Sequence, residues 1–218
     1  MKTATQPFQF ATAAYLTRIL NQKALNLREF CLGLESCSDA SIFYHTFQSL
    51  SRHHFLTEGF SSDFAQWAMA ACNRADLAEQ LAALDIRDYL SLADLRGDLH
   101  RVVSDYCRAN PQYVEQTSFE PFFFCESVEV TMLLGFEART LEEFRDGVRR
   151  LTSASFYYHF ITSRLRLHLR TNDFSLWLAD NLGLGTLATR ANRIDISTNT
   201  LESAHAIMLS LIEGELSQ

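Results

Sequence analysis

The sequence has few residues that interrupt helices, with only three prolines and eight glycines among 218 residues. It contains no proline-rich, glycine-rich or serine-rich linker, so we expect most of the chain to be helical. No run of 18 apolar residues occurs, and no apolar run follows a basic cluster in the first residues. We therefore expect neither a membrane span nor a signal peptide, and a cytoplasmic location.

Patterns that bind metals or activate nucleophiles are missing as well. The five cysteines form no C-x-x-C pair, so we expect reduced, mostly buried thiols. No H-x-x-x-H, H-E-x-x-H or G-x-S-x-G spacing occurs. The run from Gly183 to Thr186 lacks the lysine and the preceding strand of a phosphate loop. The sequence therefore predicts no metal ion and no cofactor.

Basic charge is scarce: the net charge is −7, and only two of the 19 basic residues are lysine. Nucleic acids and acidic membranes bind to basic surfaces, so we expect neither as a partner. Arginine is suited to bidentate contacts with carboxylates and phosphates, but genome composition explains the arginine excess more simply.

What the sequence does contain is an internal duplication. Residues 7–54 reappear at 121–168 without a gap, and after a short deletion residues 63–86 correspond to 173–196. In the first block roughly one position in three is identical, against about one in fifteen expected from ordinary composition. We call the two halves the first and the second copy. Because they have diverged elsewhere, a polar residue kept in both is a candidate for a constrained position.

Each copy predicts about five helical elements. The first begins at a capping box, Asn26-x-x-Glu29 in one copy and Thr140-x-x-Glu143 in the other. The expected helices are 26–35, 40–56, one from 63, 76–84 and 91–108, and in the second copy 140–149, 154–169, one from 173, 186–193 and 200–216.

The segment that opens each copy gives conflicting signals. Residues 126–132 alternate between polar and apolar side chains, which is typical of a strand, whereas the matching residues 11–20 look helical. The pattern leaves helix and strand open for residues 11–20 and 125–134.

We predict a mainly α-helical protein of two tandem homologous repeats, residues 1–110 and 111–218, with at most a short β segment opening each repeat. One repeat alone has a modest core, so the two are expected to pack as one globular unit with pseudo-two-fold symmetry.

The longer helix of each copy carries a polar stripe, because four polar residues are kept in both. The matched pairs are Ser41 and Ser155, His45 and His159, Ser49 and Ser163, and Arg52 and Arg166. At the helical period each quartet lies within an arc of about 80°. Guanidinium, imidazole and hydroxyl donors together are the chemistry of an anion site.

Three interpretations compete for this stripe. The two stripes could meet in a buried, mutually satisfied hydrogen-bond network. They could form an ordinary solvated face. They could also bind a phosphate, sulfate or carboxylate group, and we take the eight residues as the candidate ligand site.

Further matched residues lie beside the stripe. They are Tyr44 and Tyr158, Asp63 and Asp173, and Trp67 and Trp177. The tyrosines fit a core role better than an acid/base role. The aspartates stand at a helix start, where capping or an ion pair to Arg52 or Arg166 is expected. The tryptophans are expected in the core, although stacking on a sugar or a base stays open.

These signatures, Tyr-His followed by Asp-Phe-x-x-Trp in each copy, resemble a bacterial and archaeal family catalogued only as a domain of unknown function. The resemblance covers the chain from Phe8 to about residue 211 and implies no established activity.

As function we predict a non-enzymatic binding or regulatory module with a small-anion site between the two repeats. Its partner would be another protein or a small anionic metabolite. The alternative is a small enzyme that acts on a phosphorylated sugar or related metabolite. In that enzyme His45 or His159 would be the general acid/base, and Arg52 or Arg166 would hold the anion. The oligomeric state stays open.

Overall fold

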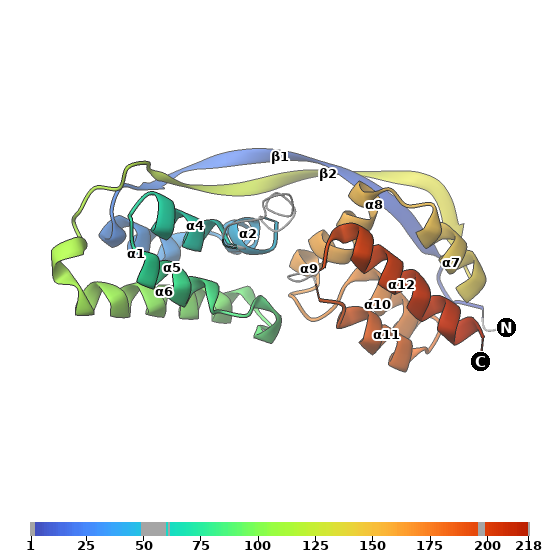
Figure 1. The fold of residues 1–218 in the computed structure, drawn as a ribbon. Helices are drawn as coiled ribbons and strands as arrows, with labels where there is room; N and C mark the ends of the chain where they lie inside the picture. Colours follow the sequence, from blue (N-terminus) through green and yellow to red (C-terminus); the bar gives the residue numbers. More distant parts are fainter. Residues whose placement is uncertain (1–2, 49–59, 61, 196–198, 218) are drawn as a thin grey trace. The chain divides into compact units, whose positions relative to one another are not determined.

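The computed structural model describes residues 3–48, 60, 62–195 and 199–217. It contains two paired antiparallel strands of 17 residues each, β1 (Phe8–Ala24) and β2 (Phe122–Ala138), shown in Figure 1. The structure is 57% helical beside this sheet. The prediction of a mainly α protein made of two packed helical repeats is therefore wrong, because the fold mixes α and β.

The reason for the error lies in the alanines of β1. Ala11, Ala13 and Ala14 favour a helix when they are taken alone. In the structure they belong to a strand that pairs with β2, in which Val128 and Val130 are β-branched. Pairing with a distant segment therefore overrides the local preference, and residues 11–20 and 125–134 are both strand.

The chain forms two compact units, and each contains strand residues from both copies. The first-copy unit comprises Leu16–Val128, and the second-copy unit comprises Met1–Tyr15 with Glu129–Gln218. The opening residues of each copy therefore pack with the helices of the other copy. The predicted domains 1–110 and 111–218 follow the sequence copies and stay a prediction.

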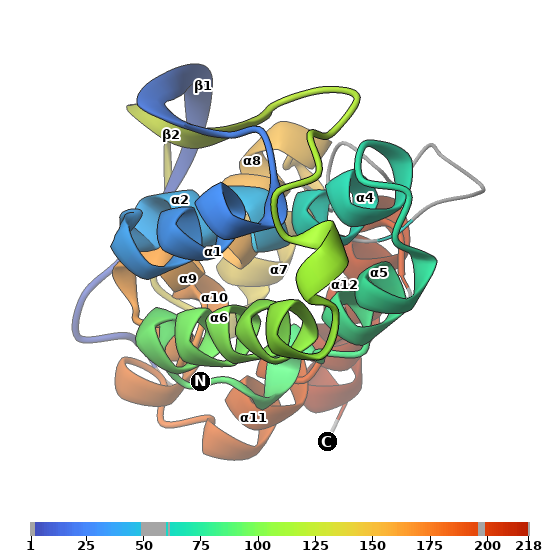
Figure 2. The ribbon, with the colours of Figure 1, turned by 90° about the vertical axis from the view of Figure 1, so that its left-hand side faces the viewer.

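Helices of the first-copy unit pack against the early part of β2. The helices of this unit are α1 (Leu27–Ser36), α2 (Asp39–Phe43), α4 (Asp63–Ala70), α5 (Ala75–Ala82) and α6 (Leu92–Ala109), with short 3₁₀ turns at Ile86–Asp88 and Pro111–Tyr113. Within this unit α1 packs against α6, and α4 packs against α5 (Figure 2).

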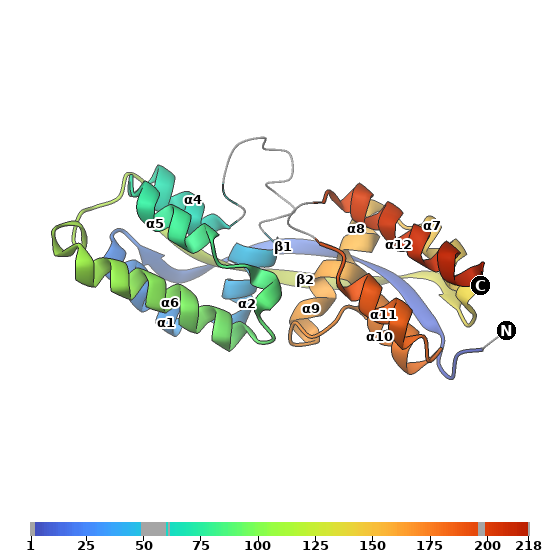
Figure 3. The ribbon, with the colours of Figure 1, turned by 60° about the horizontal axis from the view of Figure 1, so that its bottom comes forward.

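The second-copy unit repeats this arrangement around the early part of β1. Its helices are α7 (Leu141–Arg149), α8 (Ser153–Tyr157), α9 (Ser163–Arg166), α10 (Asp173–Asp180), α11 (Gly185–Asn192) and α12 (Leu201–Leu216). Here α10 packs against α11, and α7 packs against α12 (Figure 3).

The predicted capping boxes are present at α1 and α7. The Asn26 side chain accepts the Glu29 N–H at 2.9 Å, and Thr140 accepts the Glu143 N–H at 3.2 Å. Each glutamate accepts the N–H of the residue before the cap, at 2.7 Å in both copies. Both helix starts thus satisfy donors that would otherwise lack partners.

The long helices predicted at 40–56 and 154–169 are not continuous α-helices. A π-helical turn follows α2 at Tyr44–Gln48, and another lies between α8 and α9 at Tyr158–Thr162. A π-turn holds more residues than an α-turn, so the 80° arc that assumed a regular helix does not apply. Residues 49–56, including Ser49 and Arg52, lie outside the described residues.

No disulfide joins the five cysteines, all of which lie in the described part of the chain, but only Cys37 is buried. The expectation of mostly buried thiols is therefore wrong. Burial nevertheless raises the pKa of Cys37 and Cys107 to about 11 and that of Cys72 to about 12. These three thiols are poor nucleophiles at neutral pH.

None of the described helices is long and apolar enough to cross a membrane. In the same part of the chain, no cluster of three or more His, Cys, Asp or Glu side chains could hold a metal ion.

Candidate functional site

The candidate site of the second-copy unit centres on His159, which lies in the π-turn and is 3% exposed. Its Nδ1 atom lies 2.8 Å from the Asp173 carboxylate. Its Nε2 atom accepts the backbone N–H of Ala11 in β1, also at 2.8 Å. The histidine therefore connects the start of α10 with the main chain of a strand.

The first-copy unit contains the same arrangement. His45 is 3% exposed, and its Nδ1 atom lies 2.8 Å from the Asp63 carboxylate. Its Nε2 atom accepts the backbone N–H of Cys125 in β2 at 2.9 Å. Each helical unit thus uses a matched histidine to bind a strand that belongs to the other copy.

These hydrogen bonds fix the tautomer of both histidines. An Nε2 atom that accepts an N–H carries no proton, so the ring proton is on Nδ1 and is donated to the aspartate. An Asp-His pair of this kind resembles the pair that activates a nucleophile, in which Nε2 takes the proton. Here the Nε2 lone pair is already engaged by a backbone amide, so neither histidine can act as a general base in this state.

The tautomer can be tested directly. Two-dimensional ¹⁵N NMR of the imidazole rings should show His45 and His159 as Nδ1–H tautomers, because Nε2 is the acceptor in both. The exposed His168 provides an internal reference that should average between tautomers. A proton on Nε2 of His45 or His159 would contradict the hydrogen-bond assignment.

The two tryptophans bind the main chain just before these strands, at Gln6 and Glu120. The Trp177 Nε1–H donates to the carbonyl oxygen of Gln6, and the Trp67 Nε1–H donates to that of Glu120, both at 2.8 Å. In each unit one strand thus donates a backbone N–H to a histidine, and the residue two positions before that strand accepts an N–H from a tryptophan. These tryptophans are nearly buried among aromatic rings.

Two phenylalanines of each strand fill the space between these hydrogen bonds. In the second-copy unit the Phe8 ring lies 4.9 Å from His159 and 5.7 Å from Trp177, and Phe10 stacks on Phe136 at 4.8 Å. Their equivalents in the first-copy unit are Phe122 and Phe124, which pack with Phe30, Phe64, Trp67 and His45. Edge and offset contacts at such distances are favourable beyond area burial.

A glycine makes room for one of these rings in each unit. A Cβ atom at Gly147 would lie 2.2 Å from Cζ of Phe10, and a Cβ at Gly33 would lie 2.3 Å from the Phe124 ring. Both glycines lie inside helices, where the residue type is otherwise unfavourable. They are needed because the helix backbone approaches the strand's aromatic ring closely.

The remaining candidates of the second-copy stripe are engaged within their own unit. Arg166 donates to both oxygens of Asp173, at 3.1 and 2.9 Å, which is the ion pair that the sequence suggested. Ser163 donates to the His159 carbonyl at 2.5 Å and accepts the Asp173 N–H at 3.3 Å. Ser155 lies within reach of the Thr152 hydroxyl at 3.1 Å.

The matched tyrosines form hydroxyl contacts with the strands, and residues other than the matched aspartates cap α4 and α10. The Tyr158 hydroxyl lies 3.4 Å from that of Thr131, and the Tyr44 hydroxyl lies 3.0 Å from that of Thr17. Ser41 is fully buried in α2. The caps of α4 and α10 are Ser62 and Asn172, and the carboxylates of Asp63 and Asp173 face the histidines.

Arg164, on α9, lies in an unusual electrostatic setting. Its guanidinium is largely buried, and its Nη2 atom donates to the carbonyl oxygen of Asn192 at 3.1 Å. Among the described residues its Nε atom has no hydrogen-bond partner. Burial lowers the pKa of Arg164 to about 10, which leaves it charged at neutral pH. A desolvated cation would favour a small anion nearby, and the anion site stays a prediction.

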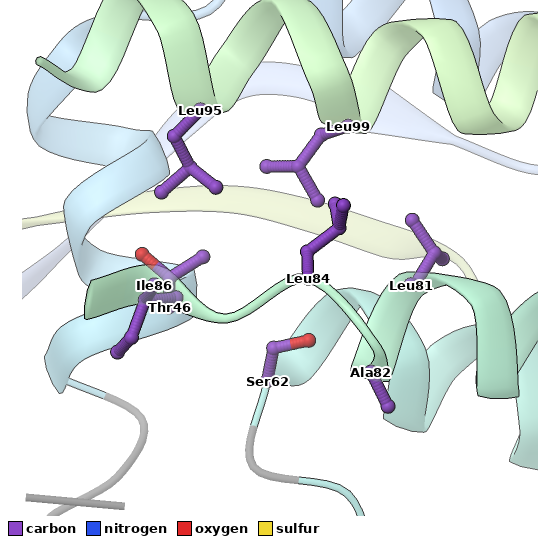
Figure 4. A pocket seen from close by; sticks show the side chains of 8 residues that line it. All are labelled: Thr46, Ser62, Leu81, Ala82, Leu84, Ile86, Leu95 and Leu99. Atoms are coloured by element: carbon purple, nitrogen blue, oxygen red, sulfur yellow. The ribbon is translucent and has the colours of Figure 1, made fainter. Parts of the chain in front are cut away.

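A small cavity lies in the first-copy unit beside α5 and α6 (Figure 4). Its lining is mostly aliphatic, with hydroxyls from Thr46 and Ser62: Thr46, Ser62, Leu81, Ala82, Leu84, Ile86, Leu95 and Leu99. Its volume of about 20 Å³ is room for one water molecule. A sugar phosphate would not fit there.

Fold and site define a protein of two compact helical units, each of which binds the opening strand of the other sequence copy. The chain belongs to a family of unknown function, DUF5752, whose model matches residues 5–213. It is similar to a solved structure described as OrfY from Thermoproteus tenax, with 30% sequence identity and a TM-score of 0.86 over 100% of this chain and 99% of that chain. No curated protein matches this sequence. The family confirms the resemblance based on Tyr-His and Asp-Phe-x-x-Trp.

Sequence reasoning missed the strand side of the site. The amides of Ala11 and Cys125 have no side-chain signature, because the backbone supplies the donor. The glycines could have been found, since Gly33 and Gly147 occupy matching positions inside two predicted helices. The repeated Pro-Phe-x-Phe pattern was visible too, but it did not show which helices it would meet.

Proposed function

We propose that this chain is a non-enzymatic protein-interaction module that binds an extended partner segment along residues 130–133 of β2. The observation that carries the proposal is a set of large apolar side chains on the strands that are exposed to solvent. In the second-copy unit Val130, Met132 and Leu133 are 53%, 48% and 70% exposed. In the first-copy unit Leu16 and Ile19 are 66% and 63% exposed.

The sheet geometry supports this proposal. In the described part of the chain the sheet has two strands, so each strand has one edge without a strand neighbour. Natural proteins usually protect such edges with charges, proline or bulges. Val130–Leu133 contains neither a charged residue nor a proline, and the strand can therefore pair with an extended segment that contributes alternating apolar side chains.

The enzymatic alternative has weaker support. General acid/base catalysis requires a histidine nitrogen that can reach the substrate, whereas His45 and His159 use both ring nitrogens within the protein. Arg166 is likewise paired with Asp173. A small anionic ligand and a cytoplasmic location stay predictions.

The test is a pair of charge substitutions with a matched control. Val130→Lys with Leu133→Lys should leave the melting temperature unchanged, because both side chains are exposed, and should reduce recovery of bound partners about tenfold or more in quantitative affinity purification. Leu90→Lys is the control, since Leu90 is 68% exposed and lies outside the strands.

The comparison has a clear negative outcome. If wild type, the double variant and Leu90→Lys recover the same proteins in the same amounts, the strand surface is not the interaction site and the proposal fails.

A further inference from the structure

The second-copy unit contains a segment that is distant in sequence from the helices it contacts. We call residues 6–15 the docked segment. It contacts side chains from Phe136 to Asn181. Three hydrogen bonds join its main chain to the side chains of His159, Trp177 and Asn181, and they span 148, 171 and 175 positions. The chain connectivity therefore does not create these contacts, and the complementary surfaces do.

The same recognition elements accept two different sequences. The second-copy unit binds Pro-Phe-Gln-Phe, with Gln9 exposed, and the first-copy unit binds Pro-Phe-Phe-Phe, with Phe123 46% exposed. In both, the outer two phenylalanines enter the core, and the histidine and tryptophan bind the backbone. Recognition thus depends on two aromatic rings and on the main chain, and the middle residue points away.

The docked segment continues into a different unit. β1 runs from Phe8 to Ala24 as one strand, but its residues up to Tyr15 belong to the second-copy unit, and those from Leu16 belong to the first-copy unit. Another molecule of the same protein carries an identical segment, so that segment can form the same hydrogen bonds and ring contacts. Exchange of identical elements costs little beyond the entropy of association.

We propose that two molecules of this protein form a strand-exchanged dimer. Residues 6–15 of each molecule dock on α7, α8 and α10 of the other molecule. The interface is isologous and closes after two chains, because each chain gives one segment and receives one. The exchange uses buried contacts of the fold, so it does not depend on the exposed strand surface assigned above to other partners.

The contact between Phe10 and Gly147 provides a specific test. Phe10→Ala removes the ring from the donated segment, and Gly147→Ala adds a methyl group that collides with that ring in the receiving unit. Each variant alone has a damaged interface. In a mixed dimer one interface is wild type, and the other brings the two substitutions together, so that the added methyl group meets the space that the ring left.

The experiment mixes the two full-length variants, each with a different affinity tag, at high concentration just below their melting temperature. Tandem purification should recover a mixed dimer, and its melting temperature should exceed that of either variant. If one variant fails to fold alone, joint refolding of the two should still yield the folded mixed species. Two differently tagged wild-type chains should also exchange under the same conditions.

Two outcomes would overturn the proposal. The first is a mixture that melts as the sum of its components and yields no doubly tagged species, with wild-type chains also failing to exchange. The second is a doubly tagged species that forms equally well from two differently tagged Gly147→Ala chains. In this outcome the species is also lost when Val130→Lys and Leu133→Lys are introduced. That result would show edge-to-edge association through the exposed strands.

Discussion

Gly147→Ala is expected to lower the free energy of unfolding by about 3 kcal/mol. The new Cβ would lie 2.2 Å from the Phe10 ring. That ring cannot move away easily, because it stacks between Phe136 and Phe144 at centroid distances of 4.8 and 6.0 Å. The loss should appear in urea unfolding curves as a lower midpoint with an unchanged slope.

A second glycine provides the control. Gly97 lies in the middle of α6, is exposed, and has no atom within 4 Å of an added Cβ. Gly97→Ala should therefore stabilise the protein by about 0.5–1 kcal/mol through helix propensity alone. A Gly147→Ala variant as stable as Gly97→Ala would mean that the strand does not approach α7 closely. Phe10→Leu, combined with Gly147→Ala, should recover part of the loss.

His159→Leu is the second substitution with a large expected effect, a loss of about 3 kcal/mol. Leucine fills a similar volume but leaves the buried N–H of Ala11 without an acceptor and removes the partner of Asp173. Because Arg166 also binds Asp173, the strand amide should account for much of the cost. Urea unfolding again measures the change.

Tyr158→Phe serves as the matched control in the neighbouring position. The Tyr158 hydroxyl lies 3.4 Å from Thr131 and is a weak hydrogen bond at most, so its removal should cost less than about 1 kcal/mol. If His159→Leu keeps wild-type stability, the histidine does not bind the strand as described. A ligand-binding role for His159 would then be the better explanation.

The sequence predicted those parts of the fold that depend on nearby residues. The capping boxes and the ends of α1 and α7 follow from side chains three to ten positions apart. The strands do not, because Ala11 and Ala13 adopt extended backbone only when β2 pairs with them. The π-turn at His159 was not predicted either, since no sequence periodicity distinguishes it from a regular α-helix.

The candidate site was predicted in composition but not in role. Matching positions correctly brought His159, Asp173 and Arg166 to one place. The sequence could not show that the third partner is a backbone amide 148 positions away, since every residue except proline offers one. Positions kept for binding a strand and positions kept for binding a ligand look identical in a duplicated sequence.

The docking of opening strands on the helices of the other copy also determines when the protein can finish folding during its synthesis. Phe8 and Phe10 are synthesised before the helices that cover them, α7 and α10, and α11 and α12 of the same unit follow later still. Until then these rings remain uncovered in the nascent chain, and such surfaces recruit chaperones or aggregate. The second-copy unit can thus be completed only after α12 has left the ribosome, so ribosomal pausing between α6 and α12 should prolong that exposure.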